Sequence, residues 1–186
     1  MTRESEAVTL GGLYRGELDV PSHGEGRVKI RFDNLRKEGA GWPPVNSEVV
    51  WAIPLPHGFE IDNIPFYAYG VAYQDKVAAR PAGDDMLTFD GVLARSGHST
   101  YRVKCAESPE DIAACNRLLR ALESEGCGHE GAHGGLYAID VPPGVDVHRI
   151  FALLEEAEKE GGLTFEEGYY YRPGCETPAA PDGIGD

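Results

Sequence analysis

Basic residues are scarce in this sequence, which has 17 lysines and arginines against 31 aspartates and glutamates in 186 residues. The imbalance is uneven, because residues 1–105 carry a net charge of −2 and residues 106–186 carry −12. Nucleic-acid binding needs a basic face, and the acidic C-terminal part would repel phosphate. We therefore expect no nucleic-acid partner. So much acid favours solubility, and it also suits a surface that binds a basic protein.

Long apolar stretches are missing as well. The sequence has no run of about 18 apolar residues of the kind that crosses a membrane. Residues 1–6 lack the apolar segment of a signal peptide. The sequence therefore predicts a cytoplasmic protein with no membrane partner.

Cysteines are few, and their spacing is not that of a metal or disulfide framework. The four are Cys105, Cys115, Cys127 and Cys175, and no two of them form a short paired motif. Neither a zinc knuckle nor a disulfide scaffold is therefore indicated. Cys105 and Cys115 fall at apolar positions, where cysteine acts as a small hydrophobic residue. Phosphate loops, dinucleotide fingerprints and nucleophile elbows are absent too, so we expect no cofactor.

Short strands separated by glycine and proline are predicted in the N-terminal half. In residues 27–32, Val28, Ile30 and Phe32 alternate with basic residues, which is typical of a half-buried strand. Further strands are predicted at residues 48–55, 59–61, 76–80 and 87–95, whereas residues 63–73 are aromatic, small and without a clear period. Strands of this length and spacing predict a small antiparallel barrel or rolled sheet.

Helices are predicted only in the C-terminal half. A strand up to residue 105 precedes a helix with start and stop signals at residues 108 and 126. Two short strands follow in residues 127–141, then a second capped helix over residues 146–161 and a last strand over residues 163–171. The order strand, helix, strand, strand, helix, strand is that of a ferredoxin-like sandwich.

The predicted fold is therefore α+β, with two halves packed together. Residues 27–99 form the barrel-like domain, and residues 100–171 form the ferredoxin-like domain. Residues 1–26 are an N-terminal extension, and residues 172–186 are expected to be a disordered acidic tail. Close packing is expected because residues 96–100 leave almost no linker between the halves.

Several spaced blocks resemble a known family. These are Trp42-Pro43-Pro44-Val45, Ser47-Glu48, Asp62-Asn63-Ile64-Pro65-Phe66-Tyr67-Ala68, Gly70-Val71-Ala72-Tyr73 and Arg95-Ser96-Gly97-His98-Ser99-Thr100. From Val28 to Tyr171 the sequence resembles the bacterial domain-of-unknown-function family 4265. The resemblance implies a small soluble bacterial protein with no agreed activity, so no functional residues carry over. Gln74 departs from the family, in which we expect glycine at this turn.

One group of polar residues could carry catalysis. It consists of Asp62, Asn63, His98 and Ser99, with Tyr101 as an addition. A histidine beside hydroxyls can act as a general base or activate a serine if a carboxylate lies within hydrogen-bond reach. The structural alternative is a strand-entry turn in which His98 bonds to the backbone.

A second group could bind metal. Cys127, His129 and His133 are three suitable ligands on one hairpin, and His98 or Glu130 could supply a fourth. Zinc sites of this size normally have two paired motifs. We therefore prefer a polar hairpin in solvent, without metal.

Aromatic residues form the third group. They are Trp42, Trp51, Phe66, Tyr67, Tyr69 and Tyr73. Such residues can fill a small barrel, or they can line a ligand or peptide groove. The sequence favours a non-catalytic protein- or peptide-binding or regulatory module, such as an immunity-type or inhibitor protein for a basic partner. The alternative is a small enzyme at the domain junction that uses His98, Ser99, Asp62 and Asn63.

Overall fold

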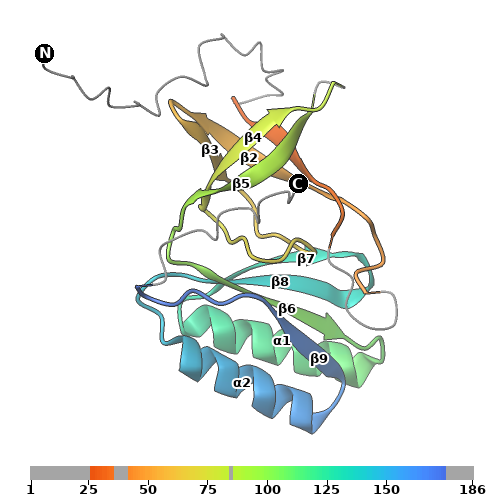
Figure 1. Ribbon diagram of the computed structural model, residues 1–186. Coiled ribbons are helices and arrows are strands. Elements are labelled where there is room, and N and C mark those ends of the chain that lie inside the picture. The colour runs from red at the N-terminus through yellow and green to blue at the C-terminus, as the bar shows by residue number, and fades with distance from the viewer. Residues whose placement is uncertain (1–25, 36–41, 84–85, 175–186) are drawn as a thin grey trace, which may run out of the picture.

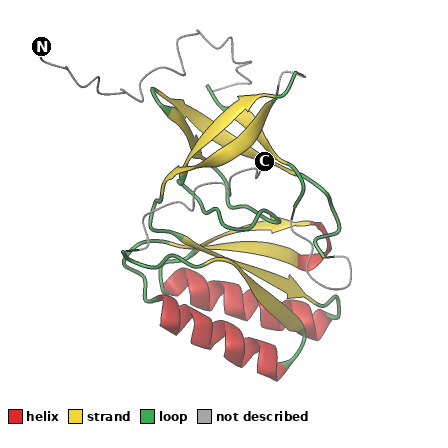
Figure 2. Cartoon of the chain, viewed as in Figure 1, coloured by secondary structure: helices red, strands yellow, loops and turns green. Residues whose placement is uncertain are grey.

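The structure is a computed structural model that describes residues 26–35, 42–83 and 86–174. It is a mixed α+β fold made mostly of strands, with a closed barrel, a second sheet and two helices (Figure 1). These form three layers in which the second sheet lies between the barrel and the helices (Figure 2). The expected N-terminal extension, apart from residue 26, and the expected tail beyond residue 174 lie outside the described residues.

Five strands close the barrel. They are β1 (Val28–Phe32), β2 (Glu48–Leu55), β3 (Gly58–Ile61), β4 (Lys76–Pro81) and β5 (Leu87–Ala94). Neighbours in chain order pair antiparallel, and β1 closes the barrel by pairing parallel with β5 at Ile30 and Leu87. The predicted barrel is therefore confirmed, but the expectation that all of its pairs are antiparallel is wrong for β1 and β5. As the alternation of β1 predicts, Val28, Ile30 and Phe32 are buried in the barrel core.

The second sheet has four antiparallel strands and the predicted element order. The elements are β6 (Ser99–Cys105), α1 (Pro109–Ser124), β7 (Gly128–Ala132), the 3₁₀ turn η1 (His133–Gly135), β8 (Leu136–Val141), α2 (Val147–Glu160) and β9 (Leu163–Tyr169). The sheet order is β7-β8-β6-β9. The side chains of Ser108 and Asp146 cap the two helices by accepting hydrogen bonds from backbone N–H groups. Both helix starts could therefore be predicted from the local sequence.

The alternation of β6 gives the second sheet two different faces. Tyr101, Val103 and Cys105 pack into the core between the sheet and the helices. Arg102 and Lys104 lie on the opposite face, which is turned toward the barrel. The barrel-facing side of this sheet therefore carries charge at the junction of the two halves.

Cys105 and Cys115 form a disulfide, with 6.1 Å between their Cα atoms. The absence of paired cysteine motifs had argued against disulfides, so that expectation was wrong for this pair. Their placement explains the error. Cys105 ends β6 and Cys115 lies on the buried face of α1, and packing the helix on the sheet brings these two positions together.

The irregular segment of residues 62–75 lies between the barrel and the second sheet (Figure 1). Its backbone reaches both layers, because Gly70 N donates to Gly168 O on β9 at 3.1 Å. In addition, Ile64 N donates to the carboxylate of Glu130 on β7 at 3.0 Å. This segment joins the two halves by hydrogen bonds from its main chain.

Two carboxylates fix the shape of that segment. Glu48 accepts the backbone N–H groups of residues 66, 67 and 68 at 2.7–2.8 Å. Asp75 is fully buried and accepts from Ala72 N, from Ser96 and from the Arg95 guanidinium, at 2.8–3.1 Å. Carboxylates with several charge-assisted hydrogen bonds are strong local anchors. The spaced sequence blocks are thus linked to one another by side chains with a structural role.

Candidate functional site

On the barrel side, the two residues of the alternative enzyme hypothesis have structural partners. Asp62 forms an ion pair with Arg27, with 2.5 Å between Oδ2 and Nε. Asn63 Oδ1 accepts the backbone N–H of Trp51 at 2.7 Å. Both side chains therefore stabilise the barrel where the chain leaves β3.

His98 has a different carboxylate partner from the predicted one. Its Nδ1 lies 2.7 Å from Asp140 Oδ1 on β8, and both side chains are buried. The ring of Tyr73 meets the imidazole edge-on at 5.6 Å between centroids. Ser99 Oγ accepts the backbone N–H of Tyr171 at 3.0 Å. His98 lines none of the four best-formed cavities among the described residues.

The residues that were considered as an alternative metal site have separate surroundings. Cys127 is buried in the core on the helix side, where burial, followed by the charges of Asp140 and Glu125, raises its pKa to about 12. Its thiol is thus protonated near neutral pH, which makes it a poor metal ligand and nucleophile. His129 is elsewhere, with its Nδ1 3.5 Å from Glu123 Oε1. Within residues 26–35, 42–83 and 86–174, no three His, Cys, Asp or Glu side chains are grouped to hold a metal ion.

The six aromatic residues divide into a cluster and two outliers. Trp42, Phe66, Tyr67 and Tyr69 lie near the junction, where Trp42 contacts Tyr67, Tyr67 contacts Phe66, and both Trp42 and Tyr69 bond to Glu166. Trp51 is on the outer face of the barrel, with the Lys29 ammonium 5.0 Å from its ring centre. Tyr73 packs on His98.

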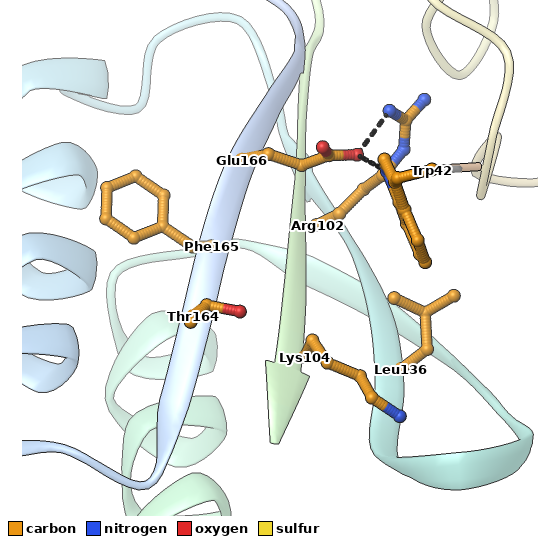
Figure 3. Close-up of a pocket in the computed structure, with 7 residues that line it drawn as sticks. All are labelled: Trp42, Arg102, Lys104, Leu136, Thr164, Phe165 and Glu166. Carbon is orange, nitrogen blue, oxygen red and sulfur yellow. Dashed lines mark hydrogen bonds and ion pairs between the residues drawn. The ribbon is translucent and has the colours of Figure 1, made fainter. Parts of the chain in front are cut away.

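A cavity of about 260 Å³ lies beside this cluster on the barrel-facing side of the second sheet. It is lined by Trp42, Arg102, Lys104, Leu136, Thr164, Phe165 and Glu166 (Figure 3). Trp42 extends toward Leu136 across the sheet face, whereas the ring of Phe165 points to the other side, toward the helices (Figure 3). The indole of Trp42 and the side chain of Leu136 therefore form the apolar wall.

An ion pair forms one end of the cavity. Arg102 Nη1 donates to Glu166 Oε1 at 2.8 Å, and Nη2 donates to the carbonyl of Ala68 at 2.5 Å. Glu166 also accepts from Trp42 Nε1 at 2.9 Å and from the Tyr69 hydroxyl at 3.1 Å. Arg102 is only 1% exposed, and its Nε has no hydrogen-bond acceptor. The ring of Tyr69 covers the guanidinium, with 4.4 Å between its centre and Arg102 Cζ.

Lys104 forms the other end of the cavity. Its Nζ donates to the carbonyl of Gly134 in the η1 turn, and no carboxylate pairs with it among the described residues. Arg102, in contrast, is balanced by Glu166. The three charged side chains of the cavity therefore sum to one positive charge, although the whole chain carries −14.

Sequence reasoning singled out Trp42 and Tyr69 but missed the strand residues of this site. Arg102 and Lys104 alternate with buried apolar residues along β6, so their position on one face could be predicted. Glu166 lies between the half-buried Phe165 and the exposed Glu167, so its sequence carries no such signal. A charged strand face normally meets solvent, however. Only the docking of the barrel and of Trp42 turns this face into a cavity.

The comparisons with known proteins are consistent with the fold described above. A solved structure from Neisseria gonorrhoeae, described as a hypothetical protein, has a TM-score of 0.62 and 23% sequence identity. The match covers 79% of this chain and 97% of that one, and at this identity it shows the fold alone. No curated protein matches the sequence. The family model described as "Domain of unknown function (DUF4265)" matches residues 48–165, and the chain belongs to that family.

Proposed function

We propose that this protein is a non-catalytic binding or regulatory module that recognises a protein or peptide through the cavity beside Trp42. The observation that carries the proposal is the cavity itself, in which an indole and a leucine lie beside a lysine that has no carboxylate partner among the described residues. Protein recognition commonly relies on an anchor side chain that fills such a pocket.

The size of the cavity favours a short peptide segment. Its volume of about 260 Å³ is at or below the lower limit of pockets that hold small molecules and cofactors, which is about 300 Å³. A single large side chain with its main-chain atoms is of the right size. The pocket also lies at the junction of the two halves, where binding sites are common.

Charge supports a basic partner for the remaining surface. The acidic residues are concentrated in residues 106–186, which carry a net charge of −12 and include both helices. An acidic surface accelerates association with a basic protein and excludes acidic ones. An immunity-type or inhibitor protein for a basic partner would have this distribution.

The alternative is a small enzyme that uses His98, Ser99, Asp62 and Asn63. The main observation in its favour is the His98–Asp140 pair, because a carboxylate at Nδ1 orients an imidazole for general-base catalysis. Against it, Asp62 pairs with Arg27, Asn63 bonds to Trp51, and His98 lines none of the described cavities. An active site needs these groups to converge on a shared pocket.

Two finer assignments also belong to the proposal. The order β7-β8-β6-β9 with both helices in one layer supports a ferredoxin-like domain over residues 100–171. A cytoplasmic location is supported by the sequence, which has no long apolar run, whereas the Cys105–Cys115 disulfide is a feature more common outside the cytosol. Among the described residues, no helix is long and apolar enough to cross a membrane.

Panning of a random peptide library that is displayed on phage with free peptide C-termini tests the function. Wild-type protein should enrich a peptide family, and Thr164→Trp should weaken binding of the selected peptide by about tenfold or more, because the indole fills the cavity. Thr164 is exposed, so the larger side chain needs no space in a core. Asn116→Trp adds the same group on the exposed surface of α1 and should bind like wild type.

Two results would count against this function. Failure to enrich any peptide would remove the binding proposal, and unchanged binding to Thr164→Trp would exclude the cavity as the site. Mass spectrometry of the selected peptide after incubation with the protein distinguishes the binding module from the enzyme alternative. Its mass should stay unchanged, whereas a mass change lost in His98→Ala would favour catalysis.

A further inference from the structure

We propose that the cavity binds the free C-terminal carboxylate of a peptide whose last residue is apolar. This inference rests on the proposed function and specifies the chemical class of the ligand. Two features carry it. One is the charge of Lys104, which no carboxylate among the described residues pairs, and the other is the apolar wall of Trp42 and Leu136.

Lys104 is the group that attracts an anion. Its side chain is exposed at the cavity, and its ammonium donates to the carbonyl of Gly134 while keeping further N–H groups for a ligand. A backbone carbonyl carries no net charge, so the positive charge of Lys104 is not neutralised within the described part of the chain. An incoming carboxylate would supply both the missing charge and an acceptor.

Glu166 does not oppose this assignment. Its carboxylate accepts three hydrogen bonds, from Arg102, Trp42 and Tyr69, and its charge is balanced by the guanidinium of Arg102. The ion pair is therefore an internal unit, which leaves one net positive charge at the Lys104 end. That charge stands out in an acidic chain, because the surrounding negative field disfavours anions elsewhere on the surface.

The apolar wall selects what is attached to the carboxylate. Trp42 and Leu136 lie on the same side of the sheet as Lys104 (Figure 3). Thr164 lies nearby, and its hydroxyl can donate to a second carboxylate oxygen or to the last amide carbonyl. An apolar side chain bonded to the same carbon as the carboxylate fills the space between these groups. A C-terminal leucine or phenylalanine combines both features within one residue.

The test compares acetyl-Gly-Gly-leucine and acetyl-Gly-Gly-phenylalanine as free acids and as C-terminal amides. Binding can be followed by the fluorescence of Trp42 in a Trp51→Phe background, because the chain has only two tryptophans. Trp51 is on the outer barrel face, away from the cavity lining. The free acids should bind about tenfold or more tightly than the amides, and the difference should shrink with added salt.

Lys104→Met should bring the affinities of acid and amide to nearly the same value. The ratio of the acid affinity to the amide affinity distinguishes a ligand contact from a structural role. A general distortion of the η1 turn would weaken the binding of both peptides alike. Lys104→Arg should restore most of the preference. Lys159→Met removes the same charge from α2, where Lys159 pairs with Glu155, and should keep the wild-type ratio.

The outcomes separate this inference from the proposed function. Equal affinity of acid and amide in the wild type would overturn the carboxylate proposal. The binding function would still stand if a selected library peptide binds the wild type and binds Thr164→Trp more weakly. If neither the library nor the defined peptides bind, both proposals fail. A preference for the acid that persists in Lys104→Met would also overturn the assignment, because the charge would then come from elsewhere.

Discussion

Gln74 adopts a backbone conformation that suits glycine better than glutamine. Its φ is 62°, and its backbone N–H donates to Ile61 O at 2.9 Å in the turn before β4. The left-handed conformation costs a residue with a Cβ about 1–2 kcal/mol, whereas glycine loses about 0.5–1 kcal/mol of chain entropy on folding. The expectation of glycine here, drawn from the family resemblance, thus agrees with the geometry.

Gln74→Gly is therefore expected to raise the free energy of unfolding by about 0.5–1 kcal/mol, since the relief of strain exceeds the added entropy cost. Urea denaturation followed by circular dichroism measures the change. Gln74→Ala keeps the Cβ and should show no gain, because its backbone strain is the same. Equal stability of the glycine and alanine variants would show that the turn is not strained.

Glu130 makes the junction sensitive to pH. Burial raises the pKa of this carboxyl, the bond from Ile64 N lowers it in part, and Asp62, Glu48 and Asp140 raise it further. A raised pKa in the folded state means that folding favours the protonated form. The stabilisation is complete below the pKa of the unfolded chain and is lost as the pH rises through the folded value.

Glu130→Gln should consequently be more stable than the wild type at about pH 7, and the gain should vanish near about pH 4, where Glu130 is protonated. The glutamine oxygen can still accept from Ile64 N, so only the charge is removed. Melting temperatures across this pH range measure the difference. Glu156→Gln on the exposed face of α2 controls for the loss of one negative charge. A gain of the same size at both pH values would contradict the assignment.

At the scale of elements, the disulfide between Cys105 and Cys115 ties β6 to α1. The two cysteines are 10 residues apart, and the loop they close contains the capped start of the helix. Closing a loop of this length in the unfolded chain is worth about 2.5–3 kcal/mol in the chain-entropy model. The bond therefore stabilises the C-terminal half in addition to its apolar core.

Reduction should lower the free energy of unfolding by about 2–3 kcal/mol, because the unfolded chain regains that loop freedom. The measurement is urea denaturation with and without a phosphine reductant. The double variant Cys105→Ser/Cys115→Ser should be destabilised without reductant and insensitive to it. A wild-type curve that does not move on reduction would mean that the bond is absent or contributes nothing.

Most elements could be predicted because their signals are local. The caps at Ser108 and Asp146 and the alternation of β1 each lie within a few residues of the element they define. The parallel closure of β1 on β5 has no such signal, since it joins strands separated by most of the barrel. The disulfide was not predicted for the same reason, because the spacing of two cysteines along the chain does not give the distance between a strand and a helix.

At the scale of the whole molecule, the site is harder to predict than the fold. The aromatic residues of the junction were identified from composition, but the pairing of Asp62 with His98 was a guess about tertiary contact. In the structure, Asp62 pairs with Arg27 and His98 pairs with Asp140. Arg102 was overlooked because it is a charged residue on a strand, and only the arrangement of the layers makes it one of the most buried side chains.

Arg102 connects three parts of the molecule. Its guanidinium bonds to Glu166 on β9 and to the carbonyl of Ala68 in the segment between the layers, and it lies against Tyr69. Removing one partner of a buried ion pair costs about 3–5 kcal/mol because the other charge is left uncompensated. Glu166 keeps 28% of its side chain exposed, so the lower end of this range applies.

Arg102→Met should therefore lower the free energy of unfolding by about 3 kcal/mol, whereas Arg102→Met/Glu166→Leu should recover part of this loss, since no charge remains unpaired. Arg80→Met is the matched control, because Arg80 and Asp90 form an exposed pair at 3.6 Å, and its effect should stay within about 0.5 kcal/mol. Urea denaturation of these variants and of the single variant Glu166→Leu gives the coupling energy of Arg102 and Glu166. If the double variant is no more stable than Arg102→Met, the loss comes from the Ala68 and Tyr69 contacts. Arg102 would then act on the segment between the layers, and the ion pair at the end of the cavity would add little to the joining of the two halves.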